Sequence, residues 1–166
     1  LPVRLCVAKV IKLRRASNLI SGRDHSLFKP PFVLPIFAML MKKYEDTYRH
    51  KGLRKQLTDS LRRKGITDER VLEAINSIPR HFFLDSAFDK VAYEDKAFPI
   101  AEGQTISQPY TVAYQTQLLE VKPFEKILEI GTGSGYQAIV LAELGAQVFT
   151  IERQKKLFDE HRKFIL

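Results

Sequence analysis

The stretch Lys126–Gln154 is KILEIGTGSGYQAIVLAELGAQVFTIERQ, with glycines at 131, 133 and 135 within five positions. An apolar run precedes the three glycines, and Gly145 separates a helix-like segment from a second apolar, β-branched run. A short apolar run that ends in glycines is typical of a buried parallel strand. The order therefore predicts strand, helix, strand and helix, a right-handed βαβ unit of an open α/β sheet.

The glycines leave bare backbone where a ligand would approach, since side chains there would collide with it. Glu152 ends the second strand 21 positions after Gly131, a spacing that places a carboxylate beside a ribose. The dinucleotide pattern G-x-G-x-x-G fails, because its last position falls on Tyr136. The acidic Glu129 suits a cofactor with a positive centre and an ammonium. We therefore favour S-adenosylmethionine, and a methyltransferase over a dehydrogenase.

Positive charge is concentrated at the start of the chain. Residues 1–43 hold nine Lys or Arg and one acid, whereas the remainder of the 166 residues holds 18 of each sign. This placement disfavours nucleic-acid binding by the body of the protein and leaves the basic leader as the alternative. The single Cys6 excludes an internal disulfide framework and a cysteine-based zinc site, and we expect no metal. No apolar run approaches the ~20 residues of a membrane span, so we expect a cytoplasmic protein.

Residues 1–40 differ in pattern from the rest of the chain. They begin with Leu and combine a loose basic stretch with an apolar stretch that three prolines interrupt. Prolines at this density break helices, and the pattern lacks the order of a secretory signal. We expect this leader to be disordered or not native, with the natural start at Met39 or Met41.

Two amphipathic helices are predicted after residue 43. The first carries leucines on one stripe and is closed by Gly65 as its C-cap. The second begins with Thr67 as its N-cap and ends at Pro79. Core packing is the simpler role for both helices, and a lid or substrate platform is the alternative.

Residues 81–110 have no sustained period and predict loops with short strands or turns. His81 could act as a general base, but its position beside two phenylalanines is more typical of a packed side chain. Pro109 suits the first turn of a helix, which places Ser107 and Gln108 at the helix entrance. Ser107 either caps this helix or lies where outward N–H groups favour an anionic group such as a carboxylate.

The stretch RHFFLDSAFDKVAYEDKAFPIAEGQTISQPYTVAYQTQLLEV, followed by KILEIGTGSGYQA, resembles the protein-L-isoaspartate O-methyltransferase family. The resemblance covers about Tyr44 to Leu166. GQTISQPY is characteristic of this family, whereas LEIGTGSGYQA in looser form is shared by many methyltransferases. The resemblance implies methyl transfer from S-adenosylmethionine to the α-carboxylate of isoaspartyl residues in damaged proteins. The methyl ester then collapses to a succinimide, which reopens partly to normal aspartate.

The resemblance also implies roles for individual residues. Ser107 matches the active-site serine, and we expect it to orient the substrate carboxylate, which is already ionised and needs no strong base. The residues expected at the cofactor are Gln104, Thr105, Ile106, Ser107, Glu129, Gly131, Thr132, Gly133, Ser134, Gly135 and Glu152. Among them the glycines form the turn and Glu152 is the ribose ligand.

The implied fold is α/β, a Rossmann-like class I S-adenosylmethionine-dependent methyltransferase. We expect a partial methyltransferase domain over residues 41–166. Within it, residues 41–120 hold the N-terminal helices and the substrate loop, and residues 121–166 hold the first part of the cofactor-binding sheet. The doubly wound sheet is expected to be incomplete at the C-terminus, which would leave the chain poorly stable and inactive by itself.

The expected partners are isoaspartyl-containing proteins and peptides, with the protein itself a monomer that binds neither nucleic acid nor membrane. Three alternatives stay open: another class I methyltransferase, a nucleotide-cofactor oxidoreductase, and an inactive truncated fragment. Binding of S-adenosylhomocysteine but not NAD would favour a methyltransferase over an oxidoreductase.

Overall fold

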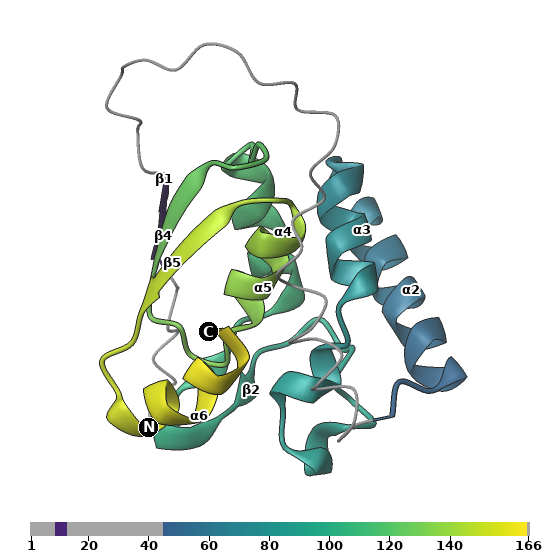
Figure 1. Ribbon diagram of the computed structural model, residues 1–166. Helices are drawn as coiled ribbons and strands as arrows, with labels where there is room; N and C mark the ends of the chain where they lie inside the picture. The colour runs from purple at the N-terminus through teal and green to yellow at the C-terminus, as the bar shows by residue number, and fades with distance from the viewer. Residues whose placement is uncertain (1–8, 13–44, 166) are drawn as a thin grey trace.

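A three-stranded sheet lies at one side of the molecule, with helices packed on one of its faces, in the computed structural model, which describes residues 9–12 and 45–165 (Figure 1). In the sheet, β1 (Lys9–Lys12) runs antiparallel to β4 (Lys126–Ile130), and β4 runs parallel to β5 (Gln147–Ile151). The helix α5 (Tyr136–Glu143) joins β4 to β5. The βαβ unit predicted from the glycine-rich stretch is therefore confirmed.

The strand β1 comes from the leader, where the sequence predicts disorder or non-native residues. Its four residues pair with β4, with Val10 opposite Glu129. At these four positions the structure has a strand in place of the predicted disorder, because the free edge of β4 offers unpaired backbone groups to an extended segment. The rest of the leader, including Met39 and Met41, lies outside the described residues.

Four helices pack into the main core beside the sheet. α2 (Tyr48–Arg63) and α3 (Glu69–Ser77) lie against each other, and α3 also contacts α4 (Pro109–Leu118) and α5. Buried apolar side chains from these helices form one cluster, which includes Leu57, Leu61, Val71, Leu72, Ile75, Val112 and Val140. Core packing, the simpler of the two predicted roles, accounts for the apolar faces of α2 and α3.

The predicted C-terminal ends of α2 and α3 are correct, since α3 ends at Ser77 with Ile78 as its C-cap directly before Pro79, but the predicted N-cap of α3 is wrong. Gly65 follows the end of α2 with φ of 97°, a conformation that favours glycine. The N-cap of α3 is Asp68, whose side chain accepts from the Arg70 N–H, and not the predicted Thr67. The N–H of Thr67 instead donates to Gln117 Oε1 on α4 at 2.6 Å. A long-range partner thus displaces the local cap.

The segment between α3 and α4 contains short elements, as its lack of a period predicts. These elements are η1 (Arg80–Phe83), η2 (Ser86–Phe88), β2 (Phe98–Pro99), η3 (Ala101–Gly103) and β3 (Thr105–Ile106). Arg80 is fully buried and donates to the carbonyls of Ala92 at 3.0 Å and Lys96 at 3.2 Å. Its guanidinium lies 5.1 Å from the Tyr136 ring centroid. Arg80 therefore ties this loop segment to the start of α5.

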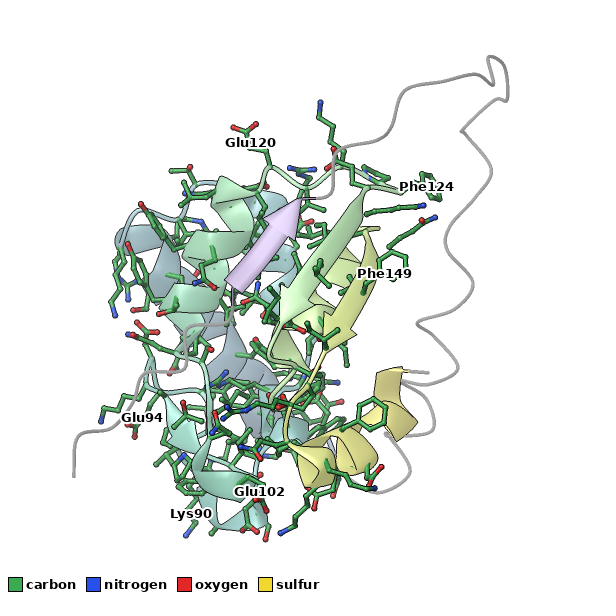
Figure 2. All side chains as sticks on the ribbon, turned by 90° about the vertical axis from the view of Figure 1, so that its left-hand side faces the viewer. Lys90, Glu94, Glu102, Glu120, Phe124 and Phe149 are labelled. Carbon is green, nitrogen blue, oxygen red and sulfur yellow. The ribbon has the colours of Figure 1, made fainter. Side chains whose placement is uncertain are left out.

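One face of the sheet remains exposed in the described part of the chain. Figure 2 views this face, and no described helix covers it. Phe149 and Ile151 on β5 are 50% and 54% exposed, which agrees with the apolar face expected of an incomplete sheet. α6 (Lys155–Ile165) follows β5 and contacts η3. None of the described helices combines the length and the apolar character needed to cross a membrane.

Candidate functional site

The glycine turn after β4 is fixed to the end of β5 by backbone hydrogen bonds. The N–H groups of Gly131 and Thr132 both donate to the Ile151 carbonyl, at 2.8 and 3.2 Å. Gly131 and Gly133 have φ of 92° and 53°, which side chains rarely adopt. A Cβ on Gly131 would meet no atom within 4 Å, so open space borders the backbone there and a ligand can approach it closely.

Glu152 lies directly beside this turn, at the end of β5. Its Oε2 accepts from the Gly133 N–H at 2.9 Å, and its Oε1 accepts from the Gln154 N–H at 2.8 Å. Each carboxylate oxygen can accept a second hydrogen bond. Glu152 can therefore stabilise the turn and still accept from the hydroxyl groups of a sugar.

Glu129 is buried within the sheet instead of lying at an open mouth. Its side chain has 0% exposure, and its Oε2 accepts from the Thr150 hydroxyl at 2.6 Å. The cross-strand register explains this bond, since Glu129 on β4 pairs with Thr150 on β5. Its Oε1 has no hydrogen-bond partner among the described residues. Burial and, to a lesser extent, the charge of Glu152 raise the pKa of the carboxyl to about 7, although the Thr150 hydrogen bond opposes them.

The predicted site residues from two distant segments line one cavity of about 440 Å³. Ten of them contribute to its wall: Gln104, Thr105, Ile106, Ser107, Glu129, Gly131, Thr132, Gly133, Ser134 and Glu152. Gly135 does not line the cavity and instead begins α5 as its N-cap with φ of 81°. A volume of this size suits a ligand of the nucleoside class.

Sequence patterns did not identify several other residues of the cavity wall, which are Val112, Ile130, Tyr136, Gln137, Ile151, Arg153 and Gln154. Tyr136 follows the last glycine of the turn, where the dinucleotide pattern would require glycine, and its side chain is almost fully buried. The spacing that excludes that pattern could have marked Tyr136 as part of the wall.

At the N-terminus of α4, the structure places other residues in the two positions that the sequence predicts for Ser107 and for an anionic ligand group. The N-cap is Gln108, so Ser107 is not the cap. The Asp95 carboxylate accepts from the Tyr110 N–H at 2.8 Å and pairs with Lys64. A carboxylate of the chain itself therefore occupies the N-terminus of α4. Ser107 can still contact a ligand, because it lines the cavity from the preceding segment.

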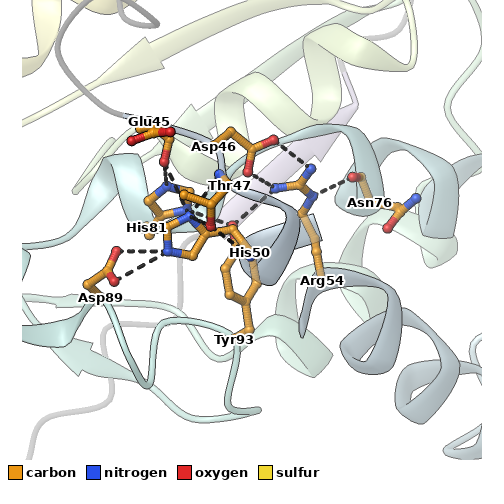
Figure 3. Close-up of polar contacts among 9 residues, drawn as sticks. All are labelled: Glu45, Asp46, Thr47, His50, Arg54, Asn76, His81, Asp89 and Tyr93. Atoms are coloured by element: carbon orange, nitrogen blue, oxygen red, sulfur yellow. Dashed lines mark hydrogen bonds and ion pairs between the residues drawn. The ribbon is translucent and has the colours of Figure 1, made fainter. Parts of the chain in front are cut away.

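His81 belongs to a separate polar network, the histidine cluster, which we define as Asp46, His50, Arg54, His81 and Tyr93 (Figure 3). His81 is buried, its Nδ1 lies 2.7 Å from the Tyr93 hydroxyl, and its ring stacks on that of His50 with centroids 3.9 Å apart. Arg54 donates to both carboxylate oxygens of Asp46 and to the Tyr93 hydroxyl. His81 lies outside the cavity wall, which favours its packed role over a general base.

Three members of the histidine cluster could offer donor atoms to a metal ion. Atoms of Asp46, His50 and His81 lie within 4.8 Å of one another. Both oxygens of Asp46, however, already bind the Arg54 guanidinium, at 2.9 and 3.1 Å. A cation would have to displace that guanidinium, so we assign the cluster a structural role.

Comparisons with known proteins agree on one family. The family model for protein-L-isoaspartate(D-aspartate) O-methyltransferase (PCMT) matches residues 52–165. The chain is 61% identical over 121 residues to the protein-L-isoaspartate O-methyltransferase of Christiangramia forsetii, covering 73% of this chain and 57% of that protein. It is 67% identical over 114 residues to the corresponding enzyme of Flavobacterium johnsoniae, covering 69% and 54%. The chain thus spans about half the length of the curated relatives it matches.

A solved structure gives the same result for the fold. It is a beta-aspartate methyltransferase (PCMT) from Plasmodium falciparum in complex with S-adenosyl-L-homocysteine. The TM-score is 0.58 at 27% sequence identity, over 68% of this chain and 54% of that one. The described part of the chain therefore has the fold of a class I methyltransferase, as the sequence predicts.

Proposed function

The chain belongs to the protein-L-isoaspartate(D-aspartate) O-methyltransferase family, and from this premise we propose that it binds S-adenosylmethionine in the cavity beside the glycine turn. The reaction proposed for that site is methyl transfer to the α-carboxylate of isoaspartyl residues in damaged proteins. The product is a methyl ester that collapses to a succinimide and so begins the repair of the damaged linkage.

One observation carries the proposal. The segment Gln104–Ser107 and the glycine turn, which are more than 20 positions apart in the sequence, both contribute to the wall of one cavity. The wall combines accessible backbone with the carboxylates of Glu129 and Glu152. Such a wall suits a ligand that carries ribose hydroxyl groups and positive charge, and suits a pyrophosphate badly.

The chain's own residues supply binding and alignment for this reaction. Bound S-adenosylmethionine supplies the activated methyl group. Glu152 is placed to accept from ribose hydroxyls, while Glu129 offers a bare oxygen to a positive group. We propose that Ser107, which lines the same cavity, orients the substrate carboxylate against the methyl group. A carboxylate is ionised at neutral pH, so the site needs alignment and exclusion of water more than a base.

Tyr136 favours a methyltransferase over a nucleotide-cofactor oxidoreductase. It stands where the third glycine of a dinucleotide turn would be, and its side chain is 2% exposed. That third glycine permits close packing of helix and strand in dinucleotide-binding folds. In this chain a phenol ring is present instead, and it packs against Arg80 and Phe83. We accordingly expect the chain to bind S-adenosylhomocysteine and not NAD.

The partners proposed for this chain are isoaspartyl-containing proteins and peptides. We also propose that the protein is a cytoplasmic monomer that binds no nucleic acid. The absence of nucleic-acid binding is supported by the charge balance of residues 44–166, where basic and acidic residues are equal in number. A salt-dependent titration with nucleic acid, before and after deletion of residues 1–40, tests it.

The decisive test uses two synthetic peptides that differ only in one isoaspartyl or aspartyl linkage. The full chain is incubated with each peptide and methyl-labelled S-adenosylmethionine, and base-labile methyl ester is counted. Label on the isoaspartyl peptide alone is the expected result. Equal label on both peptides would contradict the proposed specificity, and binding of NAD in place of S-adenosylhomocysteine would contradict the cofactor.

Ser107 provides the matched variant for this assay. We expect Ser107→Ala to lower turnover on the isoaspartyl peptide by about 10- to 100-fold, because one hydrogen bond that orients the carboxylate is lost. Its affinity for S-adenosylhomocysteine should change far less. Ser86→Ala, on the exposed η2 segment outside the cavity, is the control. Full turnover by Ser107→Ala would show that the residue has no orienting role.

A further inference from the structure

Glu129 is a buried carboxyl group with only one of its two oxygens bonded. It lies in the middle of β4, between Val10 on β1 and Thr150 on β5. The Thr150 hydroxyl donates to Oε2, and the Thr132 hydroxyl lies 2.7 Å from that of Thr150. Oε1 has no partner among the described residues, although Glu129 lines the cavity. Such an atom marks a place where a ligand group completes the bonding.

The cavity wall supplies little positive charge to an ionised Glu129. On the neighbouring strand β1, the partner of Glu129 is Val10, and the two lysines of that strand pair with other residues of β4. Two other charged residues line the cavity: Glu152, which repels a second carboxylate, and Arg153, which is exposed and therefore screened by solvent. Tyr136 is neutral, because burial raises the pKa of its phenol. The remaining cavity residues are uncharged. Ionising Glu129 in the absence of a ligand therefore means burying a negative charge close to another one.

We propose that the cavity binds its cationic ligand with release of a proton from Glu129. The inference rests on the proposed function, since the cation is the ammonium or the sulfonium of S-adenosylmethionine. The carboxylic O–H bond breaks, the proton leaves to solvent, and the electron pair stays on the carboxylate. The ligand thereby supplies the positive charge that the cavity wall does not.

Proton release makes the affinity depend on pH. The pKa of Glu129 in the ligand-free protein is about 7, and a bound cation lowers it. The affinity therefore rises with pH, by roughly tenfold per pH unit well below pH 7, and levels off above that value. The amino group of the ligand itself titrates near pH 8. Only the difference between the wild type and Glu129→Gln isolates the contribution of Glu129.

The test is calorimetric titration of the full chain with S-adenosylmethionine and S-adenosylhomocysteine, at pH 6, in two buffers of different ionisation enthalpy. We expect the wild type to release close to one proton per bound ligand and Glu129→Gln to release none. Glu73→Gln changes an exposed carboxylate on α3 and should behave as the wild type. Release with both ligands assigns the ammonium as the cation, and release with S-adenosylmethionine alone assigns the sulfonium.

A ligand-free measurement separates this inference from the proposed function. The infrared difference between the wild type and Glu129→Gln should show a protonated carboxyl band at pH 6 that disappears by about pH 8. An ionised Glu129 at pH 6, or binding by the wild type without proton release, would overturn the inference. Failure of both ligands to bind while the carboxyl band is present would overturn the proposed function, and the inference with it.

Discussion

The histidine cluster and the glycine-turn cavity each contain an acidic side chain, an arginine and a tyrosine, but they differ in how their buried polar groups are bonded. In the histidine cluster, Arg54 binds Asp46 and Tyr93, and the Tyr93 hydroxyl binds His81 (Figure 3). At the cavity, Glu129 Oε1 has no partner among the described residues. An unsatisfied buried polar group costs about 1–3 kcal/mol. The two sites are therefore distinguished by whether their buried polar atoms have hydrogen-bond partners, and not by their residue types.

The largest expected effect is on stability and belongs to the histidine cluster. Arg54 and Asp46 have side chains that are 7% and 10% exposed, with a nitrogen–oxygen distance of 2.9 Å. Arg54→Ala leaves the Asp46 carboxylate without its partner and should lower the free energy of unfolding by about 3–5 kcal/mol. Denaturant titration of the full chain measures this loss.

Arg62 offers a control for that prediction, because it is also an arginine in ion pairs, with Asp59 and Glu69, but is 47% exposed. Arg62→Ala should leave the unfolding midpoint nearly unchanged, since exposed ion pairs contribute little. Equal effects of Arg54→Ala and Arg62→Ala would show that burial does not distinguish the two arginines. The structural role of the histidine cluster would then lose its support.

The next expected effect concerns alanine substitutions at two glycines, which should change stability equally but ligand affinity unequally. Gly131 and Gly65 have nearly the same φ, 92° and 97°, and a Cβ on either one would meet no atom within 4 Å. Alanine at either position should therefore cost a similar 1–2 kcal/mol or so in backbone strain. Only Gly131→Ala also places a methyl group in the cavity wall, so it alone should weaken S-adenosylhomocysteine binding, by roughly tenfold or more.

Calorimetric titration and thermal unfolding of both variants test this expectation. Equal loss of stability with unequal loss of affinity is the expected pattern. Equal loss of affinity in Gly65→Ala and Gly131→Ala would mean that the turn contributes to binding only through the stability of the fold. The bare backbone of Gly131 would then have no direct role in ligand binding.

The elements that could be predicted from the sequence are those determined by local chemistry. Three glycines between two apolar runs require a tight turn with φ above zero, and Pro109 requires a helix start. Ten of eleven predicted site residues line one cavity. Six of them follow or end β4 and β5, whose carboxyl ends meet at the same edge of the sheet, and the other four come from the segment before α4. Their binding roles stay predictions.

The features that could not be predicted depend on partners far apart in the chain. Gln117 on α4 binds Thr67 and leaves the cap of α3 to Asp68. Asp95 reaches the N-terminus of α4 from the preceding loop, and β1 pairs with β4 across more than 100 positions. Spacing along the chain contains no information on such contacts. They follow from packing, which the residue pattern of a single segment does not determine.

The smallest expected effect is a pair of opposite pH dependences at His81 and Glu129. Burial, and then the charge of His50, lowers the pKa of His81 below its usual 6.5. Below pH 6.5 the unfolded chain binds a proton that folded His81 resists, so this contribution to the free energy of unfolding is lost as pH falls. The pKa of Glu129 is raised from 4.5 to about 7. Its contribution is complete below pH 4.5 and is lost as pH rises towards 7.

Each residue changes the free energy of unfolding by at most about 1.4 kcal/mol per pH unit, so variants are needed to separate them. His81→Gln should make stability fall more steeply as pH rises from 5 to 6.5, because the opposing slope is removed. Glu129→Gln should make it rise more steeply over the same range. Unfolding midpoints of both variants at several pH values measure the slopes. Parallel curves of stability against pH for the two variants would contradict the assignment of a deprotonated His81 and a protonated Glu129 to the folded protein.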